Sequence, residues 1–304
     1  ELELKTIQKQ VVENTQVRFA NISIKVSDEF MSAVDEERKY DSDTYLVYLD
    51  KEKKSNANAN TNYNTYEHYS VKMPSKKIEN YELIKTFDSF EELKKWLKSE
   101  NNQTISKKLM KDKNCRNKFG DYVIESDDNT FAIRQAGDFM LYFDSEETGE
   151  IKKLIKARTI WDEFVEGNYK TAEPGLIFWT TMSDYSPSNY VGKPIISTNP
   201  CAEVPLEDGG ACNLGSLNLS RFIIDGYENN ARINWDQLAD STQLLVRFLD
   251  NVVTWNEDLN ALEKQRIAAK ETRRLGLGVM GIADMLNQLA IEYDSDEAID
   301  CIEQ

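Results

Sequence analysis

The segment that most restricts how this chain can fold is residues 197–220, which read STNPCAEVPLEDGGACNLGSLNLS. Pro200 fixes its own φ angle and favours an extended conformation at Asn199, so we do not expect a helix to run through Cys201. A Glu-Asp-Gly-Gly run gives a second turn signal, and the residues after Cys212 alternate between apolar and polar side chains, as in a half-buried strand. We therefore expect a loop with Cys201 at its tip, which turns back into a strand that carries Cys212.

The two cysteines of this segment allow several kinds of chemistry. A nucleophilic cysteine needs a neighbouring base, and the only histidine of the chain, His68, stands in a polar region. A zinc site uses ligands in close pairs. The four cysteines, Cys115, Cys201, Cys212 and Cys301, contain no C-x-x-C spacing, so we predict no metal site. A disulfide between Cys201 and Cys212 stays open, although 304 residues provide core enough without one. The other alternative is redox or radical chemistry, with Glu203 near enough in sequence to transfer a proton.

Taken together, the two halves of the segment resemble the catalytic subunit of ribonucleotide reductase. NPCAE at 199–203, followed by ACNLGSLNL at 211–219, is similar to the active-site finger loop and the next strand of that family. The resemblance implies an α/β fold, a ten-stranded α/β barrel with the loop threaded through its centre and its thiol shielded from water. It also implies an allosteric oxidoreductase that reduces ribonucleotides to 2′-deoxyribonucleotides for DNA replication.

The same resemblance implies a role for each reactive residue of the segment. Cys201 would carry a thiyl radical that takes the 3′ hydrogen of the ribose, and Glu203 would accept the proton of the 3′ hydroxyl. Asn199 would hydrogen-bond the ribose hydroxyls. Cys212 would be one of two thiols that reduce the 2′ position and end as a redox-active disulfide. These roles fit the residue types, because a thiol has a weak S–H bond, a carboxylate accepts protons and an amide orients hydroxyls.

The N-terminal residues resemble a second part of the same family. FANISIKVSDEFM at 19–31 is similar to the strand and helix that follow the specificity loop, where the effector nucleotide is sensed. Gln16, Val17 and Arg18 would then end that loop. The proline before Cys201 resembles the adenosylcobalamin-dependent branch, but some branches with a separate metal-bearing radical subunit share it. The resemblance therefore implies adenosylcobalamin or such a subunit as the radical source, with an external dithiol such as thioredoxin as reductant.

We expect the chain to divide into three parts: residues 1–40, 41–149 and 150–304. The first part supplies a barrel strand and a helix capped at Ser27 or Asp28, and the third carries the loop and further barrel segments. The resemblance implies further elements outside these parts, namely a strand with the first reducing cysteine, a loop for the substrate phosphate and a C-terminal segment that delivers electrons. We therefore expect companion chains and an oligomer. The alternative is a non-catalytic assembly or regulatory fragment of a barrel.

Residues 41–149 interrupt the resemblance and are expected to form a small inserted α+β domain. An Asn-rich run at 55–64 is typical of a flexible linker. The following strand–helix–helix–strand order, with lysines at 107–118, resembles small DNA-binding modules attached to mobile endonucleases, though on few residues. The alternative is a surface domain with a solvated lysine face. The insert therefore stands as an interaction or DNA-binding module in one interpretation and as an ordinary surface domain in the other.

Hydrophobic periodicity predicts the individual elements. Strands are expected at 81–87, 122–125, 176–179 and 273–281, helices at 90–98, 151–169, 235–259 and 282–289, and a hairpin over 131–143. The apolar residues of the long helix are expected in the core: Leu238, Leu244, Leu245, Phe248, Leu249, Val252 and Val253. The glycines of 273–281 lack the context of a nucleotide-binding loop, and close backbone packing explains them better.

The charge balance limits the partners that the chain as a whole can attract. Its net charge is −16, which argues against binding nucleic acid or anionic membranes through bulk charge. No apolar run reaches the length of a membrane span, and the first residues lack a signal-peptide pattern. Four unclustered cysteines suit a reducing compartment. We therefore expect a cytoplasmic protein whose small-molecule partners are a ribonucleotide and a nucleotide effector.

Overall fold

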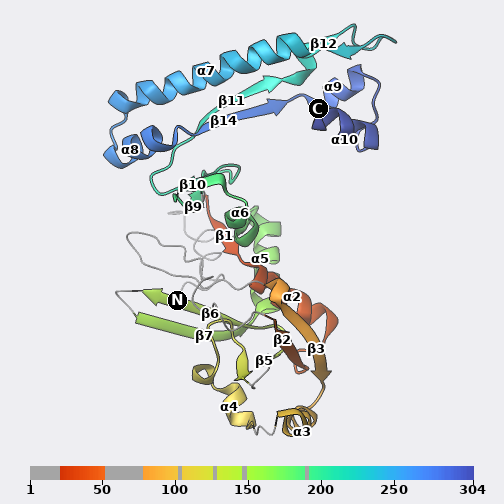
Figure 1. Ribbon diagram of the computed structural model, residues 1–304, viewed down its shortest axis with the longest axis vertical. Coiled ribbons are helices and arrows are strands. Elements are labelled where there is room, and N and C mark those ends of the chain that lie inside the picture. Colours follow the sequence, from red (N-terminus) through yellow and green to blue (C-terminus); the bar gives the residue numbers. More distant parts are fainter. Residues whose placement is uncertain (1–20, 52–77, 102–104, 126–128, 146–148, 189–191) are drawn as a thin grey trace. The chain divides into compact units, whose positions relative to one another are not determined.

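The computed structural model describes residues 21–51, 78–101, 105–125, 129–145, 149–188 and 192–304. They belong to two compact units. The first runs as far as Ile196 and includes Pro200–Pro205, and the second comprises Ser197–Asn199 and Leu206–Gln304. Both units mix helices and strands, as the α/β prediction requires (Figure 1). None of the described helices combines the length and the apolar character that spanning a bilayer requires.

The first unit contains a pair of parallel strands covered by two helices. β1 (Ser23–Val26) lies beside β8 (Gly175–Phe178). α2 (Asp28–Lys39) follows β1, and α5 (Ala157–Thr171) precedes β8. Ser27 caps α2 as predicted, because its Oγ accepts a hydrogen bond of 3.3 Å from the backbone N–H of Phe30. Apolar side chains of β1, α2 and α5 form one buried cluster: Val26, Phe30, Ala33, Val34 and Ala157.

The first unit also contains a four-stranded antiparallel sheet. Its strand order is β3 (Tyr81–Phe87), β2 (Tyr45–Asp50), β5 (Thr130–Gln135) and β4 (Tyr122–Glu125). The helices α3 (Phe90–Asn101) and α4 (Lys107–Lys111) pack on one face of this sheet. Their apolar residues share a cluster with strand residues: Phe90, Leu93, Leu97, Ile105 and Met110 with Tyr45, Val47, Ile124, Phe131 and Ile133. The predicted strands at 81–87 and 122–125 and the predicted helix from Phe90 are confirmed.

A buried group of charged residues joins the other face of the sheet to α2. Arg134 on β5 donates from Nε to Oε1 of Glu36 at 3.0 Å and from Nη1 to Oδ1 of Asp121 at 3.2 Å. Tyr48 on β2 donates to the same Glu36 oxygen at 2.6 Å. Burial lowers the pKa of Arg134, but the carboxylates of Asp121 and Glu36 outweigh it and raise that pKa above its usual value. The sheet is therefore held to α2 by a fully charged contact.

Two sequence predictions in this region are wrong. Residues 131–143 do not form a hairpin, because β5 pairs with β2 and β4 whereas β6 (Asp138–Ser145) pairs with β7 (Gly149–Lys156). The helix predicted from residue 151 begins only at Ala157. Residues 151–156 alternate as well as they repeat with helical period, and pairing with β6 selects the strand. The boundary predicted at 149 stays a prediction.

The second unit is built on two parallel strands. β11 (Asn213–Asn218) lies beside β14 (Leu275–Met280), and α7 (Trp235–Leu259) and α8 (Glu263–Thr272) lie along them (Figure 1). The shorter elements are η6 (Leu219–Phe222), β12 (Ile223–Ile224), β13 (Arg232–Ile233), α9 (Ile282–Gln288) and α10 (Asp296–Glu303). Over the described ranges the strands form five two-stranded sheets and one four-stranded sheet, with no closed barrel.

The core predicted for α7 is only partly correct. Leu249 and Val253 are buried, but Leu244 is 70% exposed and Phe248 is 58% exposed. The helix rests on β11 through residues such as Leu245, whose Cδ1 would lie 3.0 Å from a Cβ at Gly215. One contact of this width buries a narrower stripe than the apolar face of the helix offers. Leu244 and Phe248 therefore remain on its outer side.

Candidate functional site

The predicted cysteine loop is present between two short strands. β9 (Ile195–Thr198) and β10 (Pro205–Glu207) form a two-stranded sheet, and residues 199–204 connect them. We call these six residues the cysteine loop. Pro200 and Cys201 form its turn, and Ala202 takes a left-handed φ of 64°. The prediction of a stiff loop that excludes a helix at Cys201 is confirmed.

The cysteine loop presents its reactive side chains to solvent. Cys201 is a free, exposed thiol and Glu203 is also exposed, whereas Asn199 is half-buried. The expectation of a shielded thiol is therefore wrong for the described chain. Of the loop, Ala202 packs against the apolar cluster below it, which is made of Ile177, Trp179 and Ile195 with Met182. Cys201 and Glu203 stay outside this cluster, so the loop is anchored through the residue between them.

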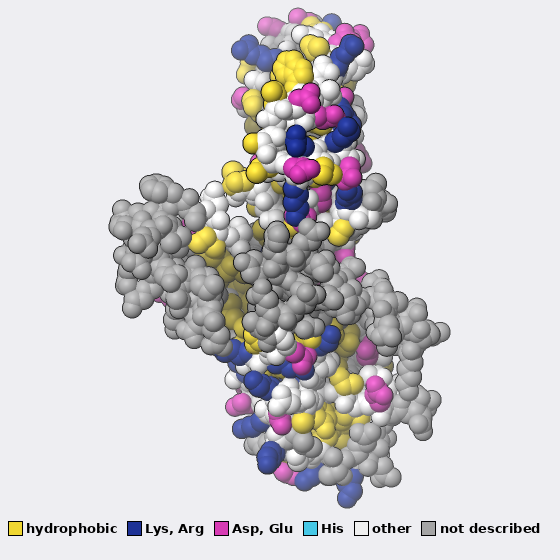
Figure 2. All heavy atoms as spheres, turned by 90° about the vertical axis from the view of Figure 1, so that its left-hand side faces the viewer, with side chains coloured by type: hydrophobic (Ala, Val, Ile, Leu, Met, Phe, Trp, Pro, Cys, Tyr) yellow, Lys and Arg dark blue, Asp and Glu magenta, His cyan; other side chains and the backbone are white. Residues whose placement is uncertain are grey.

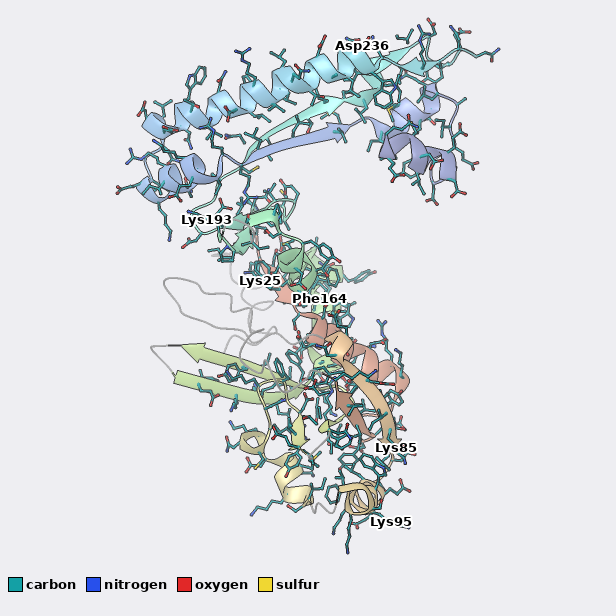
Figure 3. All side chains as sticks on the ribbon, in the orientation of Figure 1. Lys25, Lys85, Lys95, Phe164, Lys193 and Asp236 are labelled. Carbon is teal, nitrogen blue, oxygen red and sulfur yellow. The ribbon has the colours of Figure 1, made fainter. Side chains whose placement is uncertain are left out.

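A lysine that the sequence analysis did not single out lies beneath β9. Lys25 on β1 donates from Nζ to the backbone carbonyl of Ile196, and the same Nζ lies 3.7 Å from the ring centroid of Trp179 (Figure 3). Burial lowers the pKa of Lys25 to about 8. The signal that could have revealed it is a single lysine in the run Ile22–Val26, where its neighbours are otherwise apolar or small. Lys25 therefore ties the strand that enters the cysteine loop to β1.

Cys212 directly precedes β11 and is packed against a glycine. It is a free, half-buried thiol, and its Sγ lies 3.8 Å from the carbonyl oxygen of Asn213. A Cβ at Gly276 on β14 would lie 2.8 Å from this sulfur and would also overlap Leu214. Gly276 is thus required for close packing, as the sequence predicts, and it leaves the room that the Cys212 side chain occupies.

The turn after β10 is fixed by charged contacts within the second unit. Glu207 is buried and forms an ion pair with Arg274, which precedes β14. Asp208 accepts from Lys264 Nζ at 2.6 Å, and Gly209, with a φ of 74°, lies against the stem of this lysine. The sequence analysis noticed only the glycines here. A Glu-Asp pair before a Gly-Gly turn and an Arg-Arg pair before a strand are the signals that could have indicated the contact.

The remaining site predictions are placed as follows. Gln16, Val17 and Arg18 lie outside the described residues. Asn199, Cys201 and Glu203 share the cysteine loop, and Cys201 and Cys212 are both free, so the disulfide left open by the sequence is not formed in this structure. Among the described residues, no group of three or more His, Cys, Asp or Glu side chains is placed to hold a metal ion.

Comparison with known proteins gives this geometry a family. The family model described as "Ribonucleotide reductase, barrel domain" matches residues 98–304, about two thirds of the chain. The matched range contains the cysteine loop, Cys212 and both strands of the β11–β14 pair. It begins inside the segment predicted as an insert.

Three curated relatives agree with this match. The vitamin B12-dependent ribonucleoside-diphosphate reductase of Thermoplasma acidophilum is 44% identical over 153 residues, which are 50% of this chain and 19% of the relative. The protein of the same name from Mycobacterium tuberculosis is 40% identical over 154 residues, 50% of this chain and 21% of the relative. The vitamin B12-dependent ribonucleotide reductase of Agrobacterium fabrum is 33% identical over 181 residues, 56% of this chain and 13% of the relative.

The chain thus spans about a fifth or less of the length of these relatives. Within that span, the family match covers the elements that hold the cysteine loop and Cys212. The chain belongs to the ribonucleotide reductase barrel-domain family.

Proposed function

We propose that this chain is the part of a vitamin B12-dependent ribonucleotide reductase that carries the radical-forming cysteine. The observation that carries the proposal is the cysteine loop, with Asn199, Cys201 and Glu203, followed by Cys212 at the start of β11. Family membership supports it, as do relatives whose names state dependence on vitamin B12. We further propose that Gln16, Val17 and Arg18 belong to the site that senses a nucleotide effector, and that the enzyme works in the cytoplasm.

The proposed reaction begins with a hydrogen-atom transfer to Cys201. As a thiyl radical, its sulfur takes the hydrogen from C3′ of the ribose, so the C3′–H bond breaks and an S–H bond forms. Glu203 accepts the proton of the 3′ hydroxyl as general base, and Asn199 hydrogen-bonds the ribose hydroxyls. These three groups stand within five consecutive residues, so a single loop can present all of them to one sugar.

The reduction itself needs two thiols. The 2′ hydroxyl leaves as water with a proton from one of them, and oxidation of the pair to a disulfide supplies two electrons. We propose Cys212 as one of these thiols. Cys201 then returns its hydrogen atom to C3′, and an external dithiol such as thioredoxin reduces the disulfide for the next turnover.

The radical source is proposed to be adenosylcobalamin. When bound, this cofactor would supply the oxidising radical that Cys201 needs, and an exposed thiol at a loop tip is compatible with access by such a group. We assign no residue of the described chain to holding the cofactor. The cofactor-binding residues are therefore proposed to lie in polypeptide beyond the described part.

The parallel pairs β1–β8 and β11–β14 are proposed to be strands of a ten-stranded barrel, with the cysteine loop inside it. Residues 41–149 would be an insertion in that barrel, between its segments at 1–40 and 150–304. Further polypeptide, such as companion chains, would supply the remaining strands, the second reducing thiol and the loop for the substrate phosphate. The share of each relative that this chain covers supports this division.

The test is substitution of Cys201 in the assembled reductase, supplied with cofactor, ribonucleotide and a dithiol. Cys201→Ala should lower turnover by roughly a thousandfold or more, because no other group replaces the radical sulfur. Cys115→Ala, which removes another exposed cysteine, should leave turnover unchanged. Turnover that survives in Cys201→Ala would reject the radical assignment and favour a non-catalytic role in assembly or regulation.

A further inference from the structure

One stretch of the first unit has a charge opposite to that of the whole chain. Between residues 94 and 118 there are nine Lys and Arg and only two Asp and Glu, in a protein whose net charge is −16. Such an asymmetry creates a local positive field in a chain that otherwise repels anions. The stretch coincides with α3, α4 and the short helix η4 (Lys113–Cys115).

The structure places exposed lysines of this stretch on the outer side of the two helices. Apolar residues of α3 and α4 point into the core against the sheet, so their remaining sides face away from it. Figure 1 shows both helices at the same end of the first unit, and Figure 2 shows Lys and Arg gathered there. Lys95 is labelled in Figure 3. We define the basic face by its exposed lysines: Lys95, Lys98, Lys108, Lys111 and Lys113.

The spacing of these lysines gives the basic face a regular form. Lys95 and Lys98 are three residues apart on α3, and Lys108 and Lys111 are three residues apart on α4. Residues at this spacing are neighbours on a helix surface. Each helix therefore offers a pair of ammonium groups. Lys113 donates from Nζ to the carbonyl oxygen of Lys152 at 3.1 Å, which sets η4 against β7.

The charges of the basic face are not neutralised within the described part of the chain. Its four helix lysines form no ion pair with any described carboxylate, whereas Lys39 and Lys170 each pair with an acid one turn away on their own helix. The nearby Asp112 is used otherwise, since its side chain caps η4 by accepting from the N–H of Asn114 at 2.9 Å. The positive field of the basic face is thus available to an external anion.

We propose that the basic face binds the phosphate backbone of duplex nucleic acid. Pairs of lysines on a rigid helical frame contact phosphates spaced along a strand, and neighbouring Ser99 and Asn114 are exposed residues of the kind that also bind phosphate oxygens. The rest of the acidic chain would be repelled, which confines the duplex to this face. This inference is independent of the reductase function proposed above.

Two other polyanionic partners fit the basic face less well. An anionic membrane would favour exposed apolar side chains beside the lysines, but no exposed large apolar residue is found among the described residues of α3, α4 or η4. A protein interface has a dehydrated apolar centre, which this face also lacks. An acidic protein and a membrane are therefore outcomes that would overturn the proposal.

The test is fluorescence anisotropy of a labelled DNA duplex of arbitrary sequence titrated with the full 304-residue chain. The variant carries Lys95→Gln, Lys98→Gln, Lys108→Gln and Lys111→Gln. The matched control removes the same number of positive charges elsewhere, by Lys39→Gln, Lys51→Gln, Lys170→Gln and Lys270→Gln. A second variant replaces the four basic-face lysines by arginine, which keeps their charge.

We expect salt-dependent binding by the unmodified chain, with log affinity falling as log salt rises at about −0.9 per phosphate contacted. The glutamine variant should bind at least about tenfold more weakly at low salt and lose about three units of that slope. The control and the arginine variant should keep the affinity of the unmodified chain within about twofold.

Three results would overturn the proposal. They are an absence of saturable binding at low salt, equal loss of binding in the glutamine variant and its control, and displacement of the duplex by polyglutamate or by phosphatidylserine vesicles at lower charge concentration than by unlabelled DNA. A circular-dichroism melt of each variant verifies that the protein tested is folded, since exposed lysines are expected to change stability little.

Discussion

At the scale of single residues, the buried charges of the first unit decide more than the reactive cysteines do. Arg134, Glu36 and Asp121 are each almost inaccessible to solvent, and they neutralise one another. A buried charge is tolerated only while its partners remain. The contact joins residues far apart in the chain, so no local sequence pattern points to it.

Arg134→Met tests this contact. It would leave the carboxylates of Glu36 and Asp121 buried without their cation, and we expect a loss of about 3–5 kcal/mol in the free energy of unfolding. Urea unfolding followed by circular dichroism measures it. Lys39→Met, which breaks an exposed helix pair with Asp35, should cost no more than about 0.5 kcal/mol. Equal losses in the two variants would contradict a structural role for the buried group.

Lys25 gives a prediction about pH. Its pKa is lowered by burial from 10.5 to about 8, so above pH 8 the folded chain binds fewer protons at this site than the unfolded chain. Stability contributed by Lys25 therefore rises with pH between about 8 and 10.5. Because the side chain is only partly buried, we expect a gain of about 1–2 kcal/mol over this window.

The measurement is the difference in unfolding free energy between the unmodified chain and Lys25→Met at pH 7.5 and at pH 10. Other titrating groups are common to both proteins and cancel in this difference. It should move in favour of the unmodified chain as pH rises. A difference that stays constant, or that moves the other way, would show that Lys25 is not desolvated beneath β9.

At the scale of elements, the long helix α7 separates what periodicity can and cannot predict. Its bounds, Trp235–Leu259, agree with the sequence prediction, because caps and helical spacing are local properties. Which apolar residues are buried depends on what packs against the helix, and that is not local. Leu249 is 2% exposed, whereas Leu244, of the same type and predicted for the same core, is 70% exposed.

Two alanine substitutions in α7 exploit this difference. Leu249→Ala should cost about 2–4 kcal/mol through lost burial and an unfilled space. Leu244→Ala should cost no more than about 0.5 kcal/mol, since alanine is also a better helix former. Chemical denaturation of the two variants side by side is the measurement. A similar loss in both would mean that the outer side of α7 is covered in solution.

The cysteine loop and the strand after it could be predicted from sequence, whereas their surroundings could not. Pro200 and the alternation after Cys212 act within a few residues, and both predictions are confirmed. The pairing of β6 with β7 and the ion pair of Glu207 with Arg274 depend on partners selected by the tertiary fold. The ambiguous segment 151–156 shows the limit, because its residues fit a helix and a strand equally well until a partner strand is present.

At the scale of the whole molecule, the family assignment and the exposed thiol must be reconciled. The proposed chemistry needs a radical sulfur protected from water, yet Cys201 is exposed in this chain. The relatives are about five times longer than the matched part. We therefore expect the assembled reductase to cover the cysteine loop, and the chain alone to leave it open.

Alkylation by iodoacetamide tests this expectation. In the chain alone, Cys201 should be modified as readily as the exposed Cys115, because both thiols are open to the reagent. In the assembled reductase, Cys201 should be protected at least about tenfold while Cys115 is not. Peptide mass spectrometry gives the extent of modification at each cysteine. Equal protection of both thiols, or of neither, would contradict specific covering of the loop.

An uncovered cysteine at the end of a stiff loop has a further consequence for how such an enzyme must be put together. Peroxide and other oxidants convert accessible thiolates first to sulfenic acid and then, irreversibly, to higher acids. A chain waiting for its partners would lose the very atom on which turnover depends. Assembly must therefore precede exposure to oxidants, and a reducing buffer during purification should preserve the fraction of chains that can later be activated.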